Sequence, residues 1–183
     1  MVVCPSTPAD NKGLLKAAIR SDDPVVYFEH KNMWALEGEV PDGDVTVPFG
    51  VARTARAGRD LTIVSWSATV HAATRAAETL AGEGIEVEVI DLRTLWPWDK
   101  EAVFASVART GRLIVAHEAV QVGGFGAEVA ASVAEHCFKD LKAPVKRLGS
   151  PRVPIAYAPP LEDMLRVTPD KIAEAARAVV SKS

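Results

Sequence analysis

The segment that begins His117-Glu118 and continues into a run of glycines carries the residue types best suited to chemistry in this sequence. The glycines within 123–126 precede an expected helix, and free backbone N–H groups at a helix N-terminus can hold an anion. A turn packed tightly on a neighbour would use the same glycines, and Glu118 and Glu128 would weaken affinity for phosphate. His117 could act as a general base, but no Ser or Cys in an elbow motif is present for it to activate. The segment therefore predicts either a ligand contact or a packing turn, and it disfavours hydrolysis.

Other familiar sites are disfavoured by the residues at strand ends. A dinucleotide site needs a glycine-rich turn after the first strand of the domain, but the sequence there, residues 65–69, has no glycine. Asp91 stands where a ribose-binding acid would lie, and with Arg93 it predicts a structural ion pair or turn. Cys4 and Cys137 are expected to be free thiols, and the four histidines show no metal-ligand spacing with them.

The turn Trp96-Pro97-Trp98 places two large aromatic side chains directly after a strand and before a helix cap at Asp99. Such a turn most often packs beneath a loop. Exposed tryptophan is enriched at subunit interfaces, so the alternative is a contact with a partner. We expect Trp96 and Trp98 to lie at an interface.

The elements that must position these residues alternate between strands and helices from Asp60 onward. This alternation predicts an α/β domain with a mostly parallel sheet and helices on both faces, whose ligand crevice lies at the carboxyl ends of the strands. The expected strands are 61–66, 85–90, 113–116 and 143–148, and the expected helices are 69–82, 99–110, 126–140 and 168–181.

The first 30 residues predict a partial βαβ unit. Thr7 can cap a helix that runs to about Ser21, between strands at 2–3 and 25–28. The second strand is continuously apolar, which indicates burial on both faces. Because this unit alone cannot cover that strand, we expect that a partner supplies the missing sheet or that the N-terminal part of a domain has been removed. Residues 31–59, rich in Gly, Pro and charge, are expected to be an interdomain linker with one short strand at 45–47.

The composition is that of an ordinary globular protein. The chain has 183 residues, with 21 basic and 24 acidic side chains (21 − 24 = −3) and 48% hydrophobic residues, which excludes intrinsic disorder; only two cysteines exclude a disulfide scaffold. A net charge of −3 argues against general binding to nucleic acid or to a membrane surface. Because no apolar run is long enough to span a bilayer and no signal peptide is visible, we expect a cytoplasmic protein.

Over essentially its whole length the sequence resembles one family. It is similar to the C-terminal part of the beta subunit of the thiamin-diphosphate-dependent decarboxylase component of 2-oxoacid dehydrogenase complexes (pyruvate, branched-chain and acetoin types). The matching stretches are Val3–Asp10, Gly13–Arg20, Pro24–Glu29, Val87–Leu95, His117–Ala119, Gly123–Glu128 and Ala143–Arg147.

The resemblance implies a division into domains. Residues 1–30 would be the C-terminal remnant of a pyrimidine-binding domain, 31–59 the linker, and 60–183 a transketolase-type C-terminal domain. In the family the catalytic glutamate lies ahead of everything present here, and a separate alpha subunit holds the diphosphate and Mg²⁺ through a Gly-Asp-Gly motif that this sequence lacks. The resemblance therefore assigns no catalytic or cofactor-binding residue to this chain, and the isolated chain is expected neither to bind thiamin diphosphate tightly nor to turn over a 2-oxo acid.

Two further sites are implied by the resemblance. A structural potassium ion would be bound at the end of the first helix by Ala18, Ile19 and Asp23, largely through carbonyl oxygens, which suit a hard cation. The expected partners are the alpha subunit, a second beta subunit and the lipoyl acyltransferase core. The residues expected at those contacts are Trp96, Trp98, His117, Glu118, Gly123, Gly124 and Phe125.

The function that the resemblance implies is oxidative decarboxylation of a 2-oxo acid, pyruvate or branched-chain, with acyl transfer to lipoamide. In that reaction the chain would contribute assembly surface and part of the active-site wall. One alternative is a non-catalytic interaction module that docks on such a complex. Another is a piece of a different thiamin enzyme, such as a transketolase, deoxyxylulose phosphate synthase or ferredoxin-linked oxidoreductase.

Overall fold

A five-stranded sheet forms the centre of the chain in the computed structural model, which describes residues 1–181. Residues 182–183, the last two of the segment assigned to the second domain, lie outside the described part. The strand order is β3-β5-β4-β7-β8, with β3 antiparallel to β5 and all other neighbours parallel. The mostly parallel α/β sheet expected from the sequence is thus confirmed. Its strands are β3 (Arg53–Arg56), β4 (Leu61–Ser65), β5 (Val87–Asp91), β7 (Leu113–Val120) and β8 (Lys146–Ser150).

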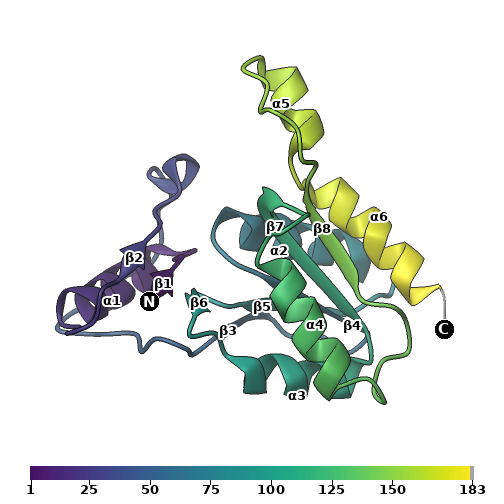
Figure 1. Cartoon of the computed structure of the whole chain (residues 1–183), viewed down its shortest axis with the longest axis horizontal. Helices are drawn as coiled ribbons and strands as arrows, with labels where there is room; N and C mark the ends of the chain where they lie inside the picture. The colour runs from purple at the N-terminus through teal and green to yellow at the C-terminus, as the bar shows by residue number, and fades with distance from the viewer. Residues whose placement is uncertain (182–183) are drawn as a thin grey trace.

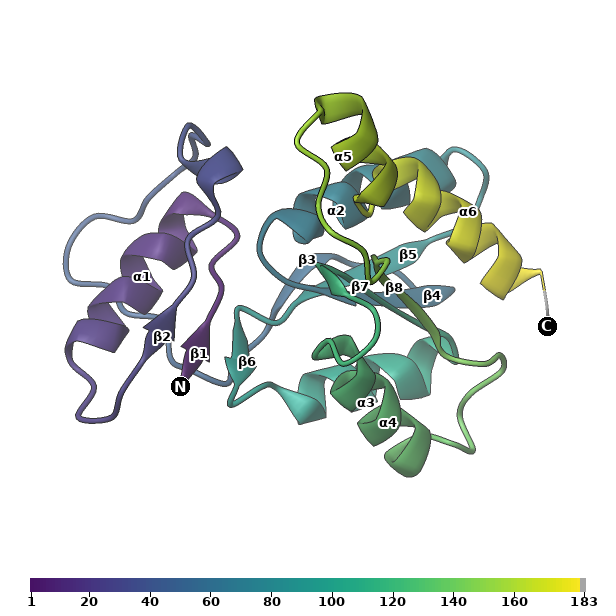
Figure 2. The same ribbon diagram turned by 45° about the horizontal axis from the view of Figure 1, so that its top comes forward.

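Helices cover both faces of this sheet, as Figure 2 shows. On one face lie α2 (Ala68–Ala81) and α6 (Pro169–Val180), and on the other lie α3 (Lys100–Thr110) and α4 (Gly126–His136). Two of these helices begin at side-chain caps: Asp99 accepts the Ala102 N–H at 3.0 Å, and Thr168 accepts the Lys171 N–H. The positions of these helices agree with the sequence prediction because capping is a local signal.

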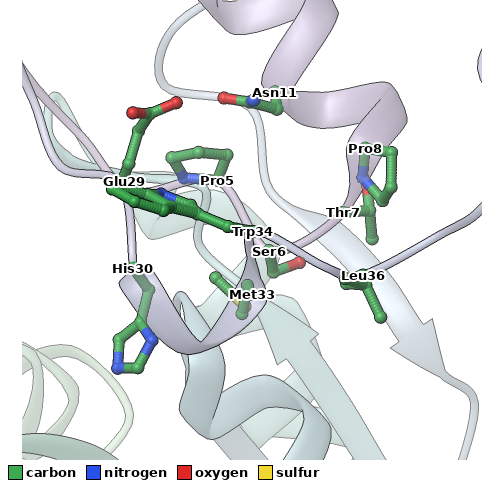
Figure 3. Close-up of a pocket in the computed structure, with 10 residues that line it drawn as sticks. All are labelled: Pro5, Ser6, Thr7, Pro8, Asn11, Glu29, His30, Met33, Trp34 and Leu36. Carbon is green, nitrogen blue, oxygen red and sulfur yellow. The ribbon is translucent and has the colours of Figure 1, made fainter.

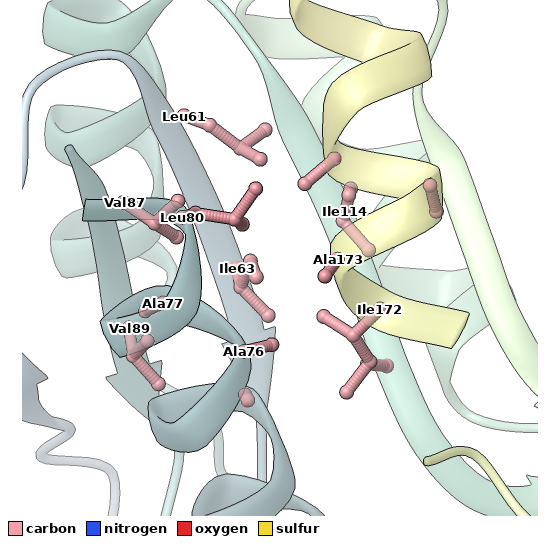
Figure 4. Packing of buried hydrophobic residues seen from close by; sticks show 14 of the residues in the cluster. Leu61, Ile63, Ala76, Ala77, Leu80, Val87, Val89, Ile114, Ile172 and Ala173 are labelled. Atoms are coloured by element: carbon pink, nitrogen blue, oxygen red, sulfur yellow. The ribbon is translucent and has the colours of Figure 1, made fainter. Parts of the chain in front are cut away.

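The core between the sheet and the α2–α6 face is built from small and branched side chains (Figure 4). Ala73, Ala76 and Ala77 are fully buried, so α2 can approach the strands closely. Ile63, at the centre of β4, pairs in register with Val89 on one side and Ile114 on the other. Full burial of one such branched side chain stabilises the fold by about 1.5–3 kcal/mol.

The N-terminal unit lies beside this domain and is completed by it (Figure 1). Strand β1 (Val2–Val3) pairs in parallel with β2 (Val26–Tyr27) and antiparallel with β6 (Thr94–Trp96), and α1 (Pro8–Ile19) connects β1 to β2. The expected βαβ unit is present. The expectation that its second strand is buried on both faces is wrong for this chain, because β2 is the edge of a three-stranded sheet and leaves Val26 and Phe28 more than half exposed.

Several segments differ from the sequence prediction. The strand expected at 45–47 is not formed; the segment 31–59 instead contains the short helix η1 (Lys31–Met33) and strand β3. Strand β6 was not expected, because it pairs with β1, which is some 90 residues away in sequence. Helix α5 (Pro159–Leu165) extends away from the domain in the Pro-rich segment, and none of its residues is buried (Figure 1).

Among the described residues, none of the helices combines the length and apolar character that a bilayer crossing requires.

A buried cluster of charges connects the N-terminal unit to the sheet. Asp91, at the end of β5, is fully buried; it accepts hydrogen bonds from the Ser6 hydroxyl and from Arg53 Nη2, the latter at 3.0 Å. Arg53 also lies 3.4 Å from Asp10, and Arg93 pairs with Asp10 at 2.7 Å. Burial raises the pKa of Asp91, while Ser6 and Arg53 act in the opposite direction. The structural ion pair expected for Asp91 is present, but its partner is Arg53 rather than Arg93, whose N–H alone contacts Asp91.

Replacement of Arg53 tests the importance of this cluster. In Arg53→Gln the two buried carboxylates lose the cation between them, and we expect the free energy of unfolding to fall by about 3 kcal/mol, since one partner of a buried pair is removed. Urea denaturation measures the change.

Arg59→Gln is the matched control. Arg59 is largely exposed and lies 4.0 Å from Asp60, so its loss is expected to change stability by no more than about 0.5 kcal/mol. Equal effects of the two substitutions would contradict a special role of the cluster.

Candidate functional site

The topology of the sheet places a crevice at the ends of β4 and β7. From β4 the chain passes through α2 to β5 on one side, and then through α3 to β7 on the other side of β4. The connections therefore diverge between β4 and β7, and ligands of doubly wound sheets bind outside the carboxyl ends of the strands at such a point. Trp66 follows β4 and His117 lies within β7, so both residues lie near the strand ends that border the crevice.

His117 lies in the interior beneath the crevice. Its ring is fully buried and stacks on Trp66, with 5.1 Å between the ring centroids and 14° between the planes. Phe125 packs edge-on against both Trp66 and Trp98, at 5.9 and 6.4 Å. The aromatic residues therefore form one cluster around the histidine.

The glycines after β7 pack directly on the His117 ring. A Cβ atom at Gly126 would lie 2.5 Å from His117 Nε2, and one at Gly124 would lie 2.8 Å from Cε1. Both distances are far below van der Waals contact, so only glycine fits there. Of the two interpretations left open by the sequence, the structure supports the packing turn.

Neither ring nitrogen of His117 has a hydrogen-bond partner in the part of the chain described. Burial lowers the pKa of His117; the Ala119 backbone acts in the opposite direction, and the nearby Arg147 guanidinium acts in the same direction as burial. The imidazole is therefore held neutral. Because it is also inaccessible, His117 does not have the exposed position that a general base requires.

Glu118, the next residue, points outward and meets the N-terminal unit. Its carboxylate lies 3.0 Å from Nε2 of His30. His30 Nδ1 accepts the backbone N–H of Asn32 at 3.2 Å, so the ring proton resides on Nε2 and is donated to Glu118. This pair crosses the crevice between two segments 88 residues apart.

Three cavities surround His30. The cavity in Figure 3, of about 430 Å³, lies on the N-terminal unit and contains Trp34 beside Pro5 and Glu29, with the His30 side chain directed away from the others. A second cavity of about 530 Å³ and a third of about 280 Å³ both include His30 and Glu118. No local signal in the sequence indicates His30, because its partner Glu118 comes from a distant strand.

The residues expected at an interface divide into exposed and buried sets. Trp96, in β6, is 62% exposed, and Glu118 and Gly123 are exposed as well. Trp98 and His117 lie in the interior, and Gly124 and Phe125 are partly buried above them. The exposed residues have the accessibility that an interface requires, whereas Trp98 and His117 belong to the interior.

The residues expected to hold potassium lie at the end of α1. Ala18 and Ile19 are its last residues, and the Ala18 carbonyl accepts the Ser21 N–H at 3.3 Å. Asp23 follows in an exposed turn, where its N–H is bonded to the Ser21 hydroxyl. Nowhere in the described chain, the end of α1 included, is a group of three or more His, Cys, Asp or Glu side chains arranged to hold a metal ion. Cys4 and Cys137 are free and buried.

The sheet order and the crevice define a doubly wound α/β domain. Residues 50–172 match the family model described as transketolase, C-terminal domain, and the chain belongs to this family. The match begins just before β3, which therefore belongs with the domain rather than with the segment that precedes it.

Relatives with known names confirm the resemblance to beta subunits. The chain is 49% identical, over 96% of its length, to acetoin:2,6-dichlorophenolindophenol oxidoreductase subunit beta from Cupriavidus necator, covering 52% of that protein. It is 47% identical, over 96%, to 2-oxoisovalerate dehydrogenase subunit beta from Bacillus subtilis, covering 54%. It is 38% identical, over its full length, to pyruvate dehydrogenase E1 component subunit beta from Porphyra purpurea, covering 55%. The chain thus spans about half the length of these relatives.

Solved structures show the same fold. A split gene transketolase, described as an inactive beta4 tetramer, superposes with a TM-score of 0.82 at 26% identity, over 98% of this chain and 57% of that one. A transketolase from Pichia stipitis superposes with a TM-score of 0.62 at 18% identity, over 98% and 25% of the two chains, which supports the fold alone.

The contact between Gly126 and His117 predicts the effect of one added methyl group. In Gly126→Ala the new Cβ collides with a buried ring, and we expect a loss of about 2 kcal/mol in the free energy of unfolding, as for other overpacked sites. Gly38→Ala is the control, because a Cβ there meets only Pro8 at 3.4 Å and should change stability by less than about 0.5 kcal/mol. Thermal or urea unfolding compares them, and an unchanged Gly126→Ala protein would disprove the tight packing.

The lowered pKa of His117 predicts a loss of stability in acid. A histidine in the unfolded chain takes up a proton near pH 6.5, whereas the folded protein resists protonation, so stability falls as pH drops through that value. Urea midpoints measured between about pH 8 and about pH 5 should decline more steeply for the native chain than for His117→Phe, which keeps a flat ring without a titrating group. Equal slopes would show that His117 does not contribute.

Proposed function

We propose that this chain forms part of the beta subunit of a thiamin-diphosphate-dependent 2-oxoacid dehydrogenase that acts on pyruvate or a branched-chain 2-oxo acid and passes the acyl group to lipoamide. The observation that carries the proposal is 38–49% identity over nearly the whole chain to beta subunits named for acetoin, 2-oxoisovalerate and pyruvate. In this function the chain contributes assembly surface and part of the active-site wall, and the protein resides in the cytoplasm.

The cofactor is thiamin diphosphate with Mg²⁺ in the assembled enzyme, where it supplies the means to remove carbon dioxide from a 2-oxo acid. The residues of this chain do not fit that group by themselves. The two carboxylates at the second cavity are already paired, Glu118 with His30 and Asp163 with Arg166, and no Gly-Asp-Gly segment is present. We infer that the isolated chain binds the cofactor weakly and that an alpha subunit holds the diphosphate and the metal.

The partners proposed are an alpha subunit, a second beta subunit and the lipoyl acyltransferase core. The surface proposed to contact these partners contains the exposed residues Trp96, Glu118 and 122–123. The buried Trp98 and His117 lie in the interior and stabilise the shape of that surface. The split gene transketolase is inactive as an assembly of beta chains. That property supports a requirement for a partner of the alpha type.

A potassium ion at the end of α1 is part of the same proposal. The carbonyl groups of Ala18 and Ile19 lie at the negative end of the helix dipole, and the exposed acids Asp22 and Asp23 follow directly. Carbonyl and carboxylate oxygens are suitable donors for a hard cation. The nearby cation Arg20 is held away from this end of the helix by Asp44, which it contacts through Nη2 at 2.8 Å and shares with Lys16.

A hybrid subunit tests the proposed function. The matching half of the Cupriavidus necator beta subunit is replaced by this chain, and the hybrid is produced with the alpha subunit of that enzyme. Because 96% of the chain aligns at 49% identity, we expect assembly with alpha and a substantial fraction of the parental activity in the acetoin and 2,6-dichlorophenolindophenol assay.

The isolated chain mixed with the same alpha subunit serves as the control. It should show no turnover, and calorimetry with thiamin diphosphate and Mg²⁺ should show no micromolar binding by the chain alone. A hybrid that assembles without activity would instead favour a non-catalytic interaction module. A hybrid that folds but does not assemble would disprove the subunit assignment.

A further inference from the structure

The cavity on the N-terminal unit, shown in Figure 3, combines an apolar wall with a few polar groups. Its volume of about 430 Å³ is large enough to hold one side chain of a partner. The apolar part of the wall is formed by Pro5, Pro8, Met33, Trp34 and Leu36. Polar side chains, among them those of Asn11 and Glu29, complete it. A ligand that fits this space must have both apolar and polar parts.

The indole of Trp34 is a large aromatic surface that the chain leaves uncovered. Trp34 directly follows η1, borders the cavity and is 69% exposed. Within residues 1–181 no other aromatic ring stacks on it and no cation lies over it. The face of an indole attracts cations, and a planar cation can also stack on it. The ring therefore offers a platform for a flat positive group.

The carboxylate of Glu29 lies beside this ring without a counter-charge. In Figure 3 it lies above the Trp34 indole, as does the Asn11 side chain. Glu29 makes no ion pair with any residue that the structure describes. The Asn11 amide is held in place by Tyr27, whose hydroxyl donates to Oδ1 at 2.7 Å. An acidic acceptor and an aromatic face therefore border the same space.

The electrostatic potential in this part of the N-terminal unit is negative. Burial raises the pKa of the Tyr27 hydroxyl, and the negative charges of Glu29 and Asp10 raise it further. A hydroxyl that resists ionisation because of nearby carboxylates reports the field that a ligand would meet there. That field favours a cation.

The cations of this chain do not fill the cavity. His30 borders it, but its side chain is directed away from the other lining residues and contacts Glu118 at 3.0 Å (Figure 3). Lys12 and Lys31 are near in sequence, but neither lines the cavity, and Lys12 donates to the Pro41 carbonyl. The positive group that would complement Glu29 must therefore come from another molecule.

We propose that this cavity binds a guanidinium group, presented as an arginine side chain by a partner protein. The planar cation stacks on the indole of Trp34 and donates hydrogen bonds to the carboxylate of Glu29. The apolar wall covers the methylene groups of the same side chain. Guanidinium is favoured over the ammonium of lysine, because only guanidinium combines stacking with a fork of parallel donors. The proposal is independent of the subunit assignment, since it depends only on groups within this chain.

Nuclear magnetic resonance of the full chain tests the proposal. Uniformly ¹⁵N-labelled protein is titrated at constant ionic strength with N-acetyl-arginine amide. A second series uses N-acetyl-citrulline amide, which has the same shape without the charge. We expect saturable shifts of the Trp34 indole N–H and of the amides of residues 29–34 with the arginine compound, and about tenfold weaker binding of the citrulline compound. Shifts that stay linear, or equal affinities for the two compounds, would overturn the proposal.

Two variants locate the site, each with a matched control. Glu29→Gln should weaken binding of the arginine compound about tenfold, because a hydrogen-bonded counter-charge is lost. Trp34→Leu should weaken it about threefold, as expected for a cation on an exposed ring. Glu39→Gln removes another exposed acid of the same segment, and Trp96→Leu removes a tryptophan that is 62% exposed in β6. Neither control residue borders the cavity, so both controls should bind as the native chain does.

Unchanged affinity in both site variants, or an equal loss in the controls, would overturn the proposal. Because Glu29 and Trp34 are exposed, their replacement leaves the core intact, and either variant alone can decide if the other does not fold. N-acetyl-lysine amide is the last comparison. If it binds as tightly as the arginine compound, the assignment to guanidinium is wrong.

Discussion

The buried carboxylate of Asp91 is the constraint on which the arrangement of the chain depends. A charge with no solvent exposure is tolerated only when it is paired and hydrogen-bonded, and its partners come from elsewhere in the sequence: Ser6 from the N-terminal unit and Arg53 from β3. Because Arg53 also meets Asp10, and Asp10 meets Arg93, the same cluster fixes the N-terminal unit against the sheet. The cavities lined by both His30 and Glu118 depend on this orientation of the two parts.

His30 and Glu118 form a pair that crosses the crevice. Beneath the crevice, Trp66 and the glycines after β7 enclose the His117 ring. His117 and Glu118, although adjacent in sequence, therefore have different roles. His117 shapes the interior, whereas Glu118 faces the space in which ligands or partners can bind. The assignment to the transketolase C-terminal domain family agrees with this arrangement, because an α/β domain of this kind presents its functional surface at strand ends.

Much of the fold could be predicted because its signals are local. Asp99 and Thr168 cap helices where they were expected to, and the apolar runs of β4 and β7 lie at the centre of the sheet. Strand β6 and the edge position of β2 could not be predicted, since both depend on pairing with β1 across the boundary between the two parts. The interface residues could be identified as a group from the resemblance, but not separated into the exposed Trp96 and the buried Trp98.

The sequence by itself determined most of the helices and strands, the mostly parallel sheet and the family, because periodicity, capping and motif order are carried by neighbouring residues. Only the tertiary structure decided which polar groups meet: Asp91 with Arg53 and Ser6, and Glu118 with His30. For Asp91 the physical reason is that burial converts a hydrated carboxylate into a group that must find a partner nearby. Which partner is nearby depends on how distant segments cross, and no local pattern encodes that.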